Sequence, residues 1–196
     1  MSNHTPAKLV ILISGRGSNM QSIVNAIQAD KLNAEVAAVI SNRPDAAGLD
    51  FARDAGITSE TLDHKNFASR EAFDQQLMDL IDKFEPDYVV LAGFMRILSA
   101  AFVQHYTNRL INIHPSLLPK FKGMHTHKRA IEAGESEHGA SVHFVTEELD
   151  AGPVILQAKV PVLEADTEET LAARVLVEEH KLYPDALRLL IEQHQS

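Results

Sequence analysis

The sequence contains no cysteine and no tryptophan among its 196 residues. Without cysteine the chain can form neither disulfides nor a thiolate nucleophile, nor a structural zinc site of the usual cysteine type. No apolar run reaches membrane-spanning length, and the first seven residues are polar and lack the apolar core of a signal peptide. With three tyrosines and no tryptophan, nothing indicates an aromatic-rich protein interface. We therefore expect a cytoplasmic protein that does not bind membranes and is a monomer or a weak homodimer.

Basic residues are also scarce, because 18 Lys and Arg stand against 27 Asp and Glu, for a formal net charge of −9. Affinity for a nucleic-acid polymer comes mainly from neutralising its phosphates, so this charge argues against nucleic acid as a partner. A single phosphate can still be held by backbone amides at the start of a helix. The length and the 45% hydrophobic residues predict a single domain with a buried core.

The stretch Leu110–Pro119 carries two polar residues in an otherwise apolar strand pattern. Side chains alternate faces along a strand, so Asn112 and His114 project from the same side. Pro115 ends the strand, which puts both donors at its C-terminal end, where open α/β sheets bind ligands. Two donors directed at one point can stabilise a developing oxyanion. The structural alternative is that His114 only caps the strand and Asn112 bonds backbone in a turn.

A glycine-rich turn follows the first predicted strand, Lys8–Ile13. Ser18 is predicted to begin a helix, with Gln21 three residues on completing a capping box. Strand, glycine turn and capped helix together form a cradle for a phosphate, although such a turn is often only a tight loop. It is not a dinucleotide fingerprint, because Met20 stands where a third glycine would fall and no acidic residue follows the next strand.

Strands and helices alternate along most of the chain, which predicts an α/β fold with a mostly parallel central sheet and helices on both faces. Gly152-Pro153 then turns the chain into an antiparallel return strand, and Thr167 caps a final helix that Pro184 is expected to kink or interrupt. Further strands are predicted at 34–40, 57–62, 87–91, 140–146 and 154–162, and further helices at 45–55, 69–84 and 99–106.

Several motifs resemble those of the glycinamide ribonucleotide formyltransferases, the folate-dependent enzymes of purine synthesis. They follow in family order from about Lys8 to about Pro184 and include Ser14-Gly15-Arg16-Gly17-Ser18-Asn19, Ala92-Gly93-Phe94-Met95-Arg96-Ile97-Leu98, Asn112-Ile113-His114-Pro115-Ser116-Leu117-Leu118-Pro119 with Gly123-Met124-His125-Thr126-His127, and Gly139–Thr146 with Leu149-Asp150-Ala151-Gly152-Pro153. The resemblance implies a Rossmann-like formyltransferase fold. It also implies transfer of the formyl group of 10-formyltetrahydrofolate, as co-substrate, to the amine of glycinamide ribonucleotide, with no metal.

The resemblance assigns catalysis to Asn112 and His114, which stabilise the intermediate, and to Asp150, which supports His114 and relays protons through water. Taken alone, Asp150 would be read as a surface turn residue. The ribonucleotide is assigned to Gly17, Ser18, Asn19, Leu176, Val177, Glu178 and Glu179. The folate is assigned to Arg70, Met95, Arg96, Ile97, Leu98, Asn112, Thr146, Glu147, Glu148, Leu149 and Asp150. Residues of about 8–107 would then form the phosphate-binding half, and about 108–196 the folate-binding and catalytic half.

Some of these residues also have simpler interpretations. By composition Met95, Ile97 and Leu98 are typical of a hydrophobic core, and Arg70 is typical of a solvated helix start. Leu176 replaces a residue that is usually polar or basic in the family, although the Glu179 carboxylate could still meet the ribose hydroxyls. The pair His125-x-His127 could suggest a metal site, but it lacks a further ligand at suitable spacing. The basic cluster formed by Lys120, Lys122, Lys128 and Arg129 is either a solvated loop or a contact for the folate glutamate tail.

Three other functions remain as alternatives. A formyltetrahydrofolate deformylase shares the Asn-x-His…Asp pattern, but carries an N-terminal regulatory domain for which this sequence has no room. A methionyl-tRNA formyltransferase needs a further C-terminal domain and a basic surface. A non-catalytic module that binds a nucleotide phosphate would leave Asn112 and His114 with structural roles only.

Overall fold

Seven strands form one mixed sheet in the order β3-β2-β1-β4-β5-β6-β7 in the computed structural model, which describes residues 4–195. β1 to β5 are mutually parallel, whereas β6 is antiparallel to β5 and β7 to β6. This confirms the predicted mostly parallel sheet with an antiparallel return strand. The strands are β1 Ala7–Ile13, β2 Ala34–Ser41, β3 Ser59–Thr61, β4 Tyr88–Leu91, β5 Leu110–His114, β6 Glu137–Phe144 and β7 Val154–Pro161.

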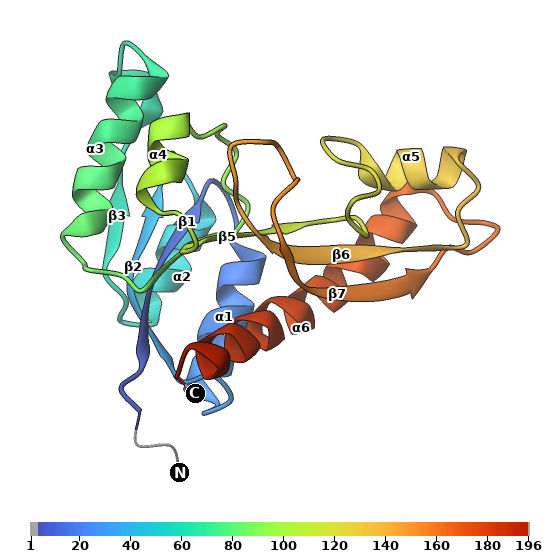
Figure 1. The fold of residues 1–196 in the computed structure, drawn as a ribbon, viewed down its shortest axis with the longest axis horizontal. Coiled ribbons are helices and arrows are strands. Elements are labelled where there is room, and N and C mark those ends of the chain that lie inside the picture. The colour runs from blue at the N-terminus through green and yellow to red at the C-terminus, as the bar shows by residue number, and fades with distance from the viewer. Residues whose placement is uncertain (1–3, 196) are drawn as a thin grey trace.

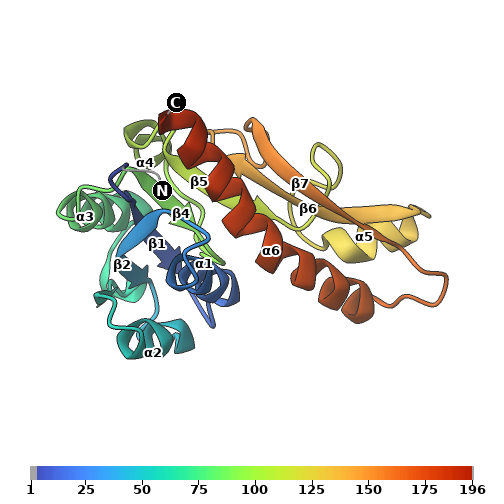
Figure 2. The ribbon, with the colours of Figure 1, turned by 90° about the horizontal axis from the view of Figure 1, so that it is seen from below.

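Helices cover both faces of the sheet, as the alternating pattern predicted (Figure 1). One face packs against α1 (Ser18–Gln28), α2 (Ala47–Asp54) and α6 (Glu168–Gln195), with α5 (Thr126–Glu132) beside α6. The other face packs against α3 (Arg70–Asp82) and α4 (Ala100–His105), and the short 3-10 helix η1 (His64–Asn66) follows β3. Figure 2 shows α6 running diagonally across its face of the sheet. No helix within residues 4–195 is long and apolar enough to cross a membrane.

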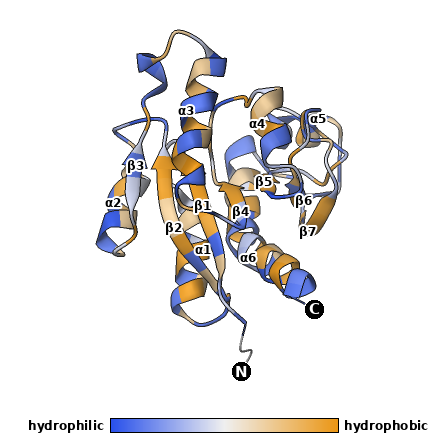
Figure 3. Cartoon of the chain, turned by 60° about the vertical axis from the view of Figure 1, so that its left-hand side comes forward, coloured by the Kyte–Doolittle hydropathy of each residue, from blue (hydrophilic) through white to orange (hydrophobic). Residues whose placement is uncertain are grey.

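The central strands are buried on both faces, which is why they are almost continuously apolar. In β1, Leu9, Ile11 and Ile13 belong to the core under α1 and α6, whereas Val10 and Leu12 belong to the core under α3 and α4. All five side chains are fully buried. Figure 3 shows these strands as hydrophobic bands between helices that carry hydrophilic residues on part of their surface. The core therefore fixes the positions of the strand ends, from which the polar loops project.

The predicted start of α1 at Ser18 is confirmed, but its capping box is wrong, and α6 is not interrupted at Pro184. The N-cap of α1 is Gly17 in the left-handed conformation (φ 65°), and no side chain caps the helix. The predicted capping box fails because the Gln21 side chain bonds the Arg16 carbonyl instead of the helix start. Pro184 does not interrupt α6, which continues to Gln195. Burial of its neighbours Tyr183 and Leu187 against the sheet outweighs the one backbone hydrogen bond that the proline removes.

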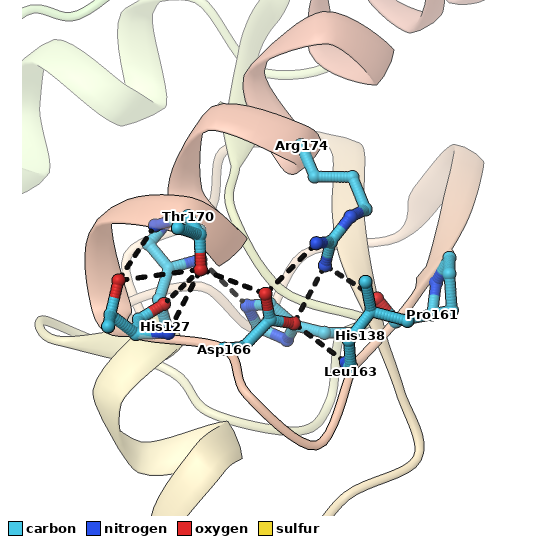
Figure 4. Close-up of polar contacts among 8 residues, drawn as sticks. His127, His138, Pro161, Leu163, Asp166, Thr170 and Arg174 are labelled. Atoms are coloured by element: carbon cyan, nitrogen blue, oxygen red, sulfur yellow. Dashed lines mark hydrogen bonds and ion pairs between the residues drawn. The ribbon is translucent and has the colours of Figure 1, made fainter.

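The start of α6 is fixed by a dense polar network (Figure 4). Thr167 Oγ1 accepts a 3.2 Å hydrogen bond from the Thr170 amide, which confirms the predicted cap. Arg174 donates to both carboxylate oxygens of Asp166, at 2.8 and 2.9 Å, and Asp166 also accepts from the Leu163 amide at 2.7 Å. These bonds tie the loop after β7 to the second turn of the helix.

The strand order changes direction between β1 and β4. β2 and β3 follow β1 on one side, and the chain then crosses to the other side of β1 to form β4. In doubly wound sheets the loops on either side of such a switch point diverge and leave a crevice at the C-terminal strand ends. Here those loops are 14–18, which follows β1, and 92–99, which follows β4. The tertiary arrangement therefore brings the glycine turn and the Ala92–Leu98 motif together.

Candidate active site

A cavity of about 280 Å³ lies at this switch point, and we call it the switch-point cavity. Its walls come from the glycine turn, the start of the loop after β4, and one face of α6. The lining residues are Gly15, Arg16, Gly17, Ser18, Asn19, Ala92, Gly93, Leu176 and His180. Residues from three distant parts of the sequence therefore build one pocket.

The backbone of the switch-point cavity is suited to an anion. Gly17 adopts a positive φ, a conformation that costs glycine little, and turns the chain directly into α1. The first amides of a helix have no intrahelical acceptor, and the helix dipole adds positive potential at this end. The predicted residues Gly17, Ser18 and Asn19 all line the cavity.

Asn19, in the first turn of α1, contacts Glu179, in the middle of α6. Asn19 Nδ2 donates a 3.3 Å hydrogen bond to Glu179 Oε1, and both side chains are buried. The side-chain oxygen of Asn19, Oδ1, is buried without a hydrogen-bond partner among residues 4–195. Burial raises the pKa of the Glu179 carboxyl to about 7, and the bond from Asn19 only partly opposes this. The pair thus offers a titratable group and an unpaired acceptor.

The other three predicted residues of α6 have different surroundings. Leu176 lines the switch-point cavity, and it is 39% exposed. Val177 is 55% exposed and is not part of the cavity wall, and Glu178 forms a 3.4 Å ion pair with Lys181. A helix presents only every third or fourth residue to one side, which separates Leu176 and Glu179 from their neighbours.

A second cavity, of about 380 Å³, opens between the ends of β4 and β5, and we call it the strand-end cavity. Its wall is mainly apolar, with polar groups at one end. Predicted folate residues that line it are Arg96, Ile97, Leu98, Asn112, Thr146, Glu147, Leu149 and Asp150. Three other predicted residues, Met95, Glu148 and Arg70, are not among its lining residues.

The loop after β4 divides its large side chains, because Phe94 and Leu98 pack against the core whereas Met95 and Ile97 are exposed. Met95 is 76% exposed and Ile97 is 69% exposed, so the core interpretation of these two residues is wrong. The Met95 amide donates to Ser14 Oγ at 2.8 Å, which anchors the loop by its backbone. Arg96 stacks over the Phe73 ring at 5.2 Å, and its Nε is buried without a partner in the described part of the chain. Arg70 lies in the first turn of α3 and is exposed.

His114 and Asp150 face each other, and of the two only Asp150 is among the lining residues of the strand-end cavity. His114 Nδ1 is 3.6 Å from Asp150 Oδ2, and both side chains are at most 8% exposed. His114 Nε2 lies 2.9 Å from the Phe121 carbonyl. A carbonyl can only accept, so Nε2 carries a proton and the second proton of an imidazolium would sit on Nδ1, facing Asp150. The Gly123 amide donates to the same carboxylate oxygen at 2.8 Å and orients it.

Asn112 lies beside this pair on β5. It is half-buried and lines the strand-end cavity together with Asp150. The antiparallel register opposes Asn112 to His143 and His114 to Ser141, so β6 holds the strand rigidly from its other edge. The arrangement places a neutral amide and a carboxylate in the cavity wall, with an imidazole against the carboxylate, which is suited to stabilising an oxyanion and moving a proton.

Two histidines of the cavities were not singled out from the sequence. His180 lines the switch-point cavity, and its Nε2 is buried without a hydrogen-bond partner among residues 4–195. His143 lines the strand-end cavity, its Nδ1 bonds the Phe144 carbonyl, and burial lowers its pKa. His143 lies within the Gly139–Thr146 motif but has no role assigned to it there, His180 lies outside the motifs, and only the packing of β6 and α6 brings them to the cavities.

The basic cluster is largely neutralised by nearby carboxylates. Lys120 Nζ contacts both oxygens of Glu135, at 3.0 and 3.1 Å, and Lys122 lies 4.0 Å from Glu148. Of the pair His125 and His127, it is His127 whose Nδ1 lies 3.1 Å from His138 Nε2 (Figure 4). Burial lowers the pKa of His138 to about 4. No group of three His, Cys, Asp or Glu side chains in the described residues lies where it could hold a metal ion.

Comparison with known proteins gives consistent matches over nearly the whole chain. The family model described as formyl transferase matches residues 7–187. Phosphoribosylglycinamide formyltransferase of Escherichia coli (strain K12) is 60% identical over 90% of this chain and 83% of that protein. The solved structure of phosphoribosylglycinamide formyltransferase from Coxiella burnetii matches with a TM-score of 0.89 and 53% identity, over 93% of this chain and 86% of that one. Glycinamide ribonucleotide transformylase 1 from Symbiobacterium toebii matches with a TM-score of 0.94 and 44% identity, over 97% and 90% of the two chains.

Proposed function

This chain belongs to the phosphoribosylglycinamide formyltransferases, and on that premise we propose that Asn112, His114 and Asp150 carry out its formyl transfer. The enzyme formylates glycinamide ribonucleotide, a small-molecule substrate, in purine biosynthesis. We propose 10-formyltetrahydrofolate as the formyl donor. The observation that carries the proposal is the 3.6 Å approach of His114 Nδ1 to Asp150 Oδ2, which lines the strand-end cavity together with Asn112.

The two cavities suit the two substrates. The switch-point cavity offers free helix amides for the phosphate of the ribonucleotide, and His180 Nε2 is an additional group that could donate to it. Glu179 can accept hydrogen bonds from the ribose hydroxyls. The strand-end cavity is mainly apolar and is lined in part by Phe94, Ile97 and Leu98, which suits a flat pteridine. Arg96, held over Phe73, is a cation for the acidic end of the folate.

Residues 8–107 thus supply most of the ribonucleotide site, with Leu176, Glu179 and His180 added from α6. Residues 108–196 supply the catalytic trio and much of the folate site, with the loop 94–98 added from the N-terminal half.

The chemistry proceeds by addition and elimination at the formyl carbon. The ribonucleotide amine attacks that carbon, and the carbonyl oxygen becomes an oxyanion that accepts hydrogen bonds from the Asn112 amide and, when His114 is an imidazolium, from its Nδ1–H. The attacking nitrogen then loses a proton to Asp150, directly or through water, and Asp150 passes that proton on to N10 of the folate. The bond between the formyl carbon and N10 breaks, which releases formylglycinamide ribonucleotide and tetrahydrofolate.

Formation of tetrahydrofolate from 10-formyltetrahydrofolate, followed with and without glycinamide ribonucleotide, tests this proposal. We expect turnover only when the ribonucleotide is present. Turnover without it would mean that water accepts the formyl group, as in a deformylase. Binding of both compounds without turnover would instead indicate a non-catalytic module and would contradict the proposal.

A further inference from the structure

The strands β4 and β5 separate at the point where the strand-end cavity begins. Their registered pairs are Val89 with Leu110 and Val90 with Ile111, and β5 continues to His114 without a further partner in β4. Leu91 and Asn112, the next residues along the two strands, both line the cavity. A parallel ladder that stops inside a sheet leaves backbone carbonyls that need other donors.

The hydroxyl of Tyr183 occupies this point of separation. It donates to the Leu91 carbonyl at 2.7 Å and lies 3.2 Å from the Ile111 carbonyl, so one O–H group bridges the two strands. Tyr183 is on α6 and is fully buried, and it packs in the core with Val90, Ala92 and Ile111. Because neighbouring residues of a strand face opposite sides, Leu91 and Asn112 project from the other face of the sheet.

These two carbonyls belong to functionally important peptide groups. The Leu91 carbonyl is part of the peptide that begins the Ala92–Leu98 loop, and the Ile111 carbonyl is part of the peptide that bears the Asn112 nitrogen. We propose that Tyr183 is a positioning residue. Its hydroxyl sets the separation of β4 and β5 and so holds Asn112 at the correct distance from the Ala92–Leu98 loop. The inference rests on the role proposed above for Asn112 and the strand-end cavity.

The ribonucleotide side has a separate anchor. The Ala92 amide donates to the Leu12 carbonyl of β1 at 2.9 Å, which holds the switch-point cavity without the tyrosine. Loss of the Tyr183 hydroxyl should therefore disturb formyl-folate turnover more than ribonucleotide binding. Tyr106 offers a matched control, because it is equally buried and its hydroxyl donates to Asp82 Oδ1 at 2.7 Å, away from both cavities.

The experiment compares Tyr183→Phe, Tyr106→Phe and Asn112→Ala with the wild-type enzyme in steady-state kinetics for each substrate. For Tyr183→Phe we expect kcat/KM for 10-formyltetrahydrofolate to fall about tenfold or more, since small displacements of reacting groups are costly. We expect its KM for glycinamide ribonucleotide to stay within about twofold, and Tyr106→Phe to stay within about twofold in all constants. Replacing residue 183 by 4-aminophenylalanine, which restores a donor, should recover most of the lost kcat/KM.

Tyr183→Phe with the same constants as Tyr106→Phe would overturn the inference while leaving the proposed function intact, provided that Asn112→Ala is impaired. An Asn112→Ala enzyme with wild-type turnover would overturn both. If the enzyme with 4-aminophenylalanine at position 183 has a kcat/KM as low as that of Tyr183→Phe, loss of the hydrogen-bond donor is not the cause of the defect and the inference is wrong. Should Tyr183→Phe fail to fold, 4-methylphenylalanine, which fills the volume of the hydroxyl without donating, takes its place in the same comparison.

Discussion

The backbone amide of Met95 donates a 2.8 Å hydrogen bond to the hydroxyl of Ser14, 81 residues earlier in the chain. The same hydroxyl donates to Asn42 Oδ1 at 2.6 Å and is buried. Ser14 immediately precedes the glycine turn, and Met95 lies in the loop beside the strand-end cavity. One serine side chain therefore links the loops that serve the two proposed substrates.

Replacing Ser14 by Ala should leave the Met95 amide without a buried acceptor. We expect the free energy of unfolding to fall by about 1–3 kcal/mol, as for other unsatisfied buried groups. Because the loop 93–98 loses its anchor, KM for 10-formyltetrahydrofolate should rise several-fold. Ser22→Ala is the control, since its hydroxyl bonds only the Ser18 carbonyl within α1. Equal folate KM values for the two variants would contradict a link between the loops.

Replacing Asp150 by Asn should remove the proton acceptor while preserving the shape of the side chain. We expect kcat to fall by about 10²–10⁴-fold with little change in either KM, the range typical of a lost general acid–base group. Glu148→Gln is the control in the same loop, because Glu148 is exposed and lies 4.0 Å from Lys122. Near-normal turnover by Asp150→Asn would show that the assigned role is wrong.

The buried Glu179 carboxyl should make ribonucleotide binding depend on pH. Its pKa in the folded protein is about 7, so it becomes protonated as the pH falls below that value. A neutral carboxyl is a weaker acceptor for ribose hydroxyls than a carboxylate. We therefore expect KM for glycinamide ribonucleotide to rise as the pH is lowered below about 7, and to be high and independent of pH in Glu179→Gln. Glu178→Gln, whose residue is paired with Lys181, should retain the wild-type profile.

The same carboxyl should also affect folding stability. Its pKa is higher in the folded state than the ordinary value of 4.5, so the folded protein binds the proton more tightly. Stability from this group is therefore fully present below pH 4.5 and falls as the pH rises to about 7, by about 3 kcal/mol in all. Denaturant unfolding should show this loss in the wild-type protein but not in Glu179→Gln. Parallel curves for the two proteins would contradict it.

The ion pair between Asp166 and Arg174 should stabilise the start of α6 in a pH-dependent way. The bonds from Arg174 hold the pKa of the Asp166 carboxyl well below its ordinary value. A depressed pKa contributes stability that is present above about pH 4 and is lost as the pH falls. We expect Asp166→Asn to melt at a lower temperature than wild type at neutral pH, with the difference shrinking in acid. Asp45→Asn is the control, because the Asp45 and Arg43 side chains are both exposed.

Local sequence was sufficient for most of the elements. The run from Lys8 to Ile13 is a strand because a segment buried on both faces must be apolar, and β5 ends at His114 because proline follows it. The cap of α6 by Thr167 was likewise predictable, since a cap involves residues only three positions apart. Patterns of this kind act over a few residues and can be read without the fold.

Other features required the tertiary structure. Met95 and Ile97 have core-type side chains but lie exposed on a loop, because that loop is anchored by the Met95 amide and by its other apolar residues, Phe94 and Leu98. Pro184 continues α6 because packing against the sheet compensates for the missing hydrogen bond. Local propensity contributes a few kcal/mol at most and is outweighed by burial in the core.

The sequence by itself determined the α/β architecture, the pairing of Asn112 and His114 on one strand, and the family motifs. Only the tertiary structure brought Asp150 to 3.6 Å from His114 and Glu179 to 3.3 Å from Asn19, 160 residues away. Contacts between distant segments depend on strand order and helix packing, which no local pattern encodes. For the same physical reason, no local pattern predicts that the Tyr183 hydroxyl of α6 bridges the Leu91 carbonyl of β4 and the Ile111 carbonyl of β5.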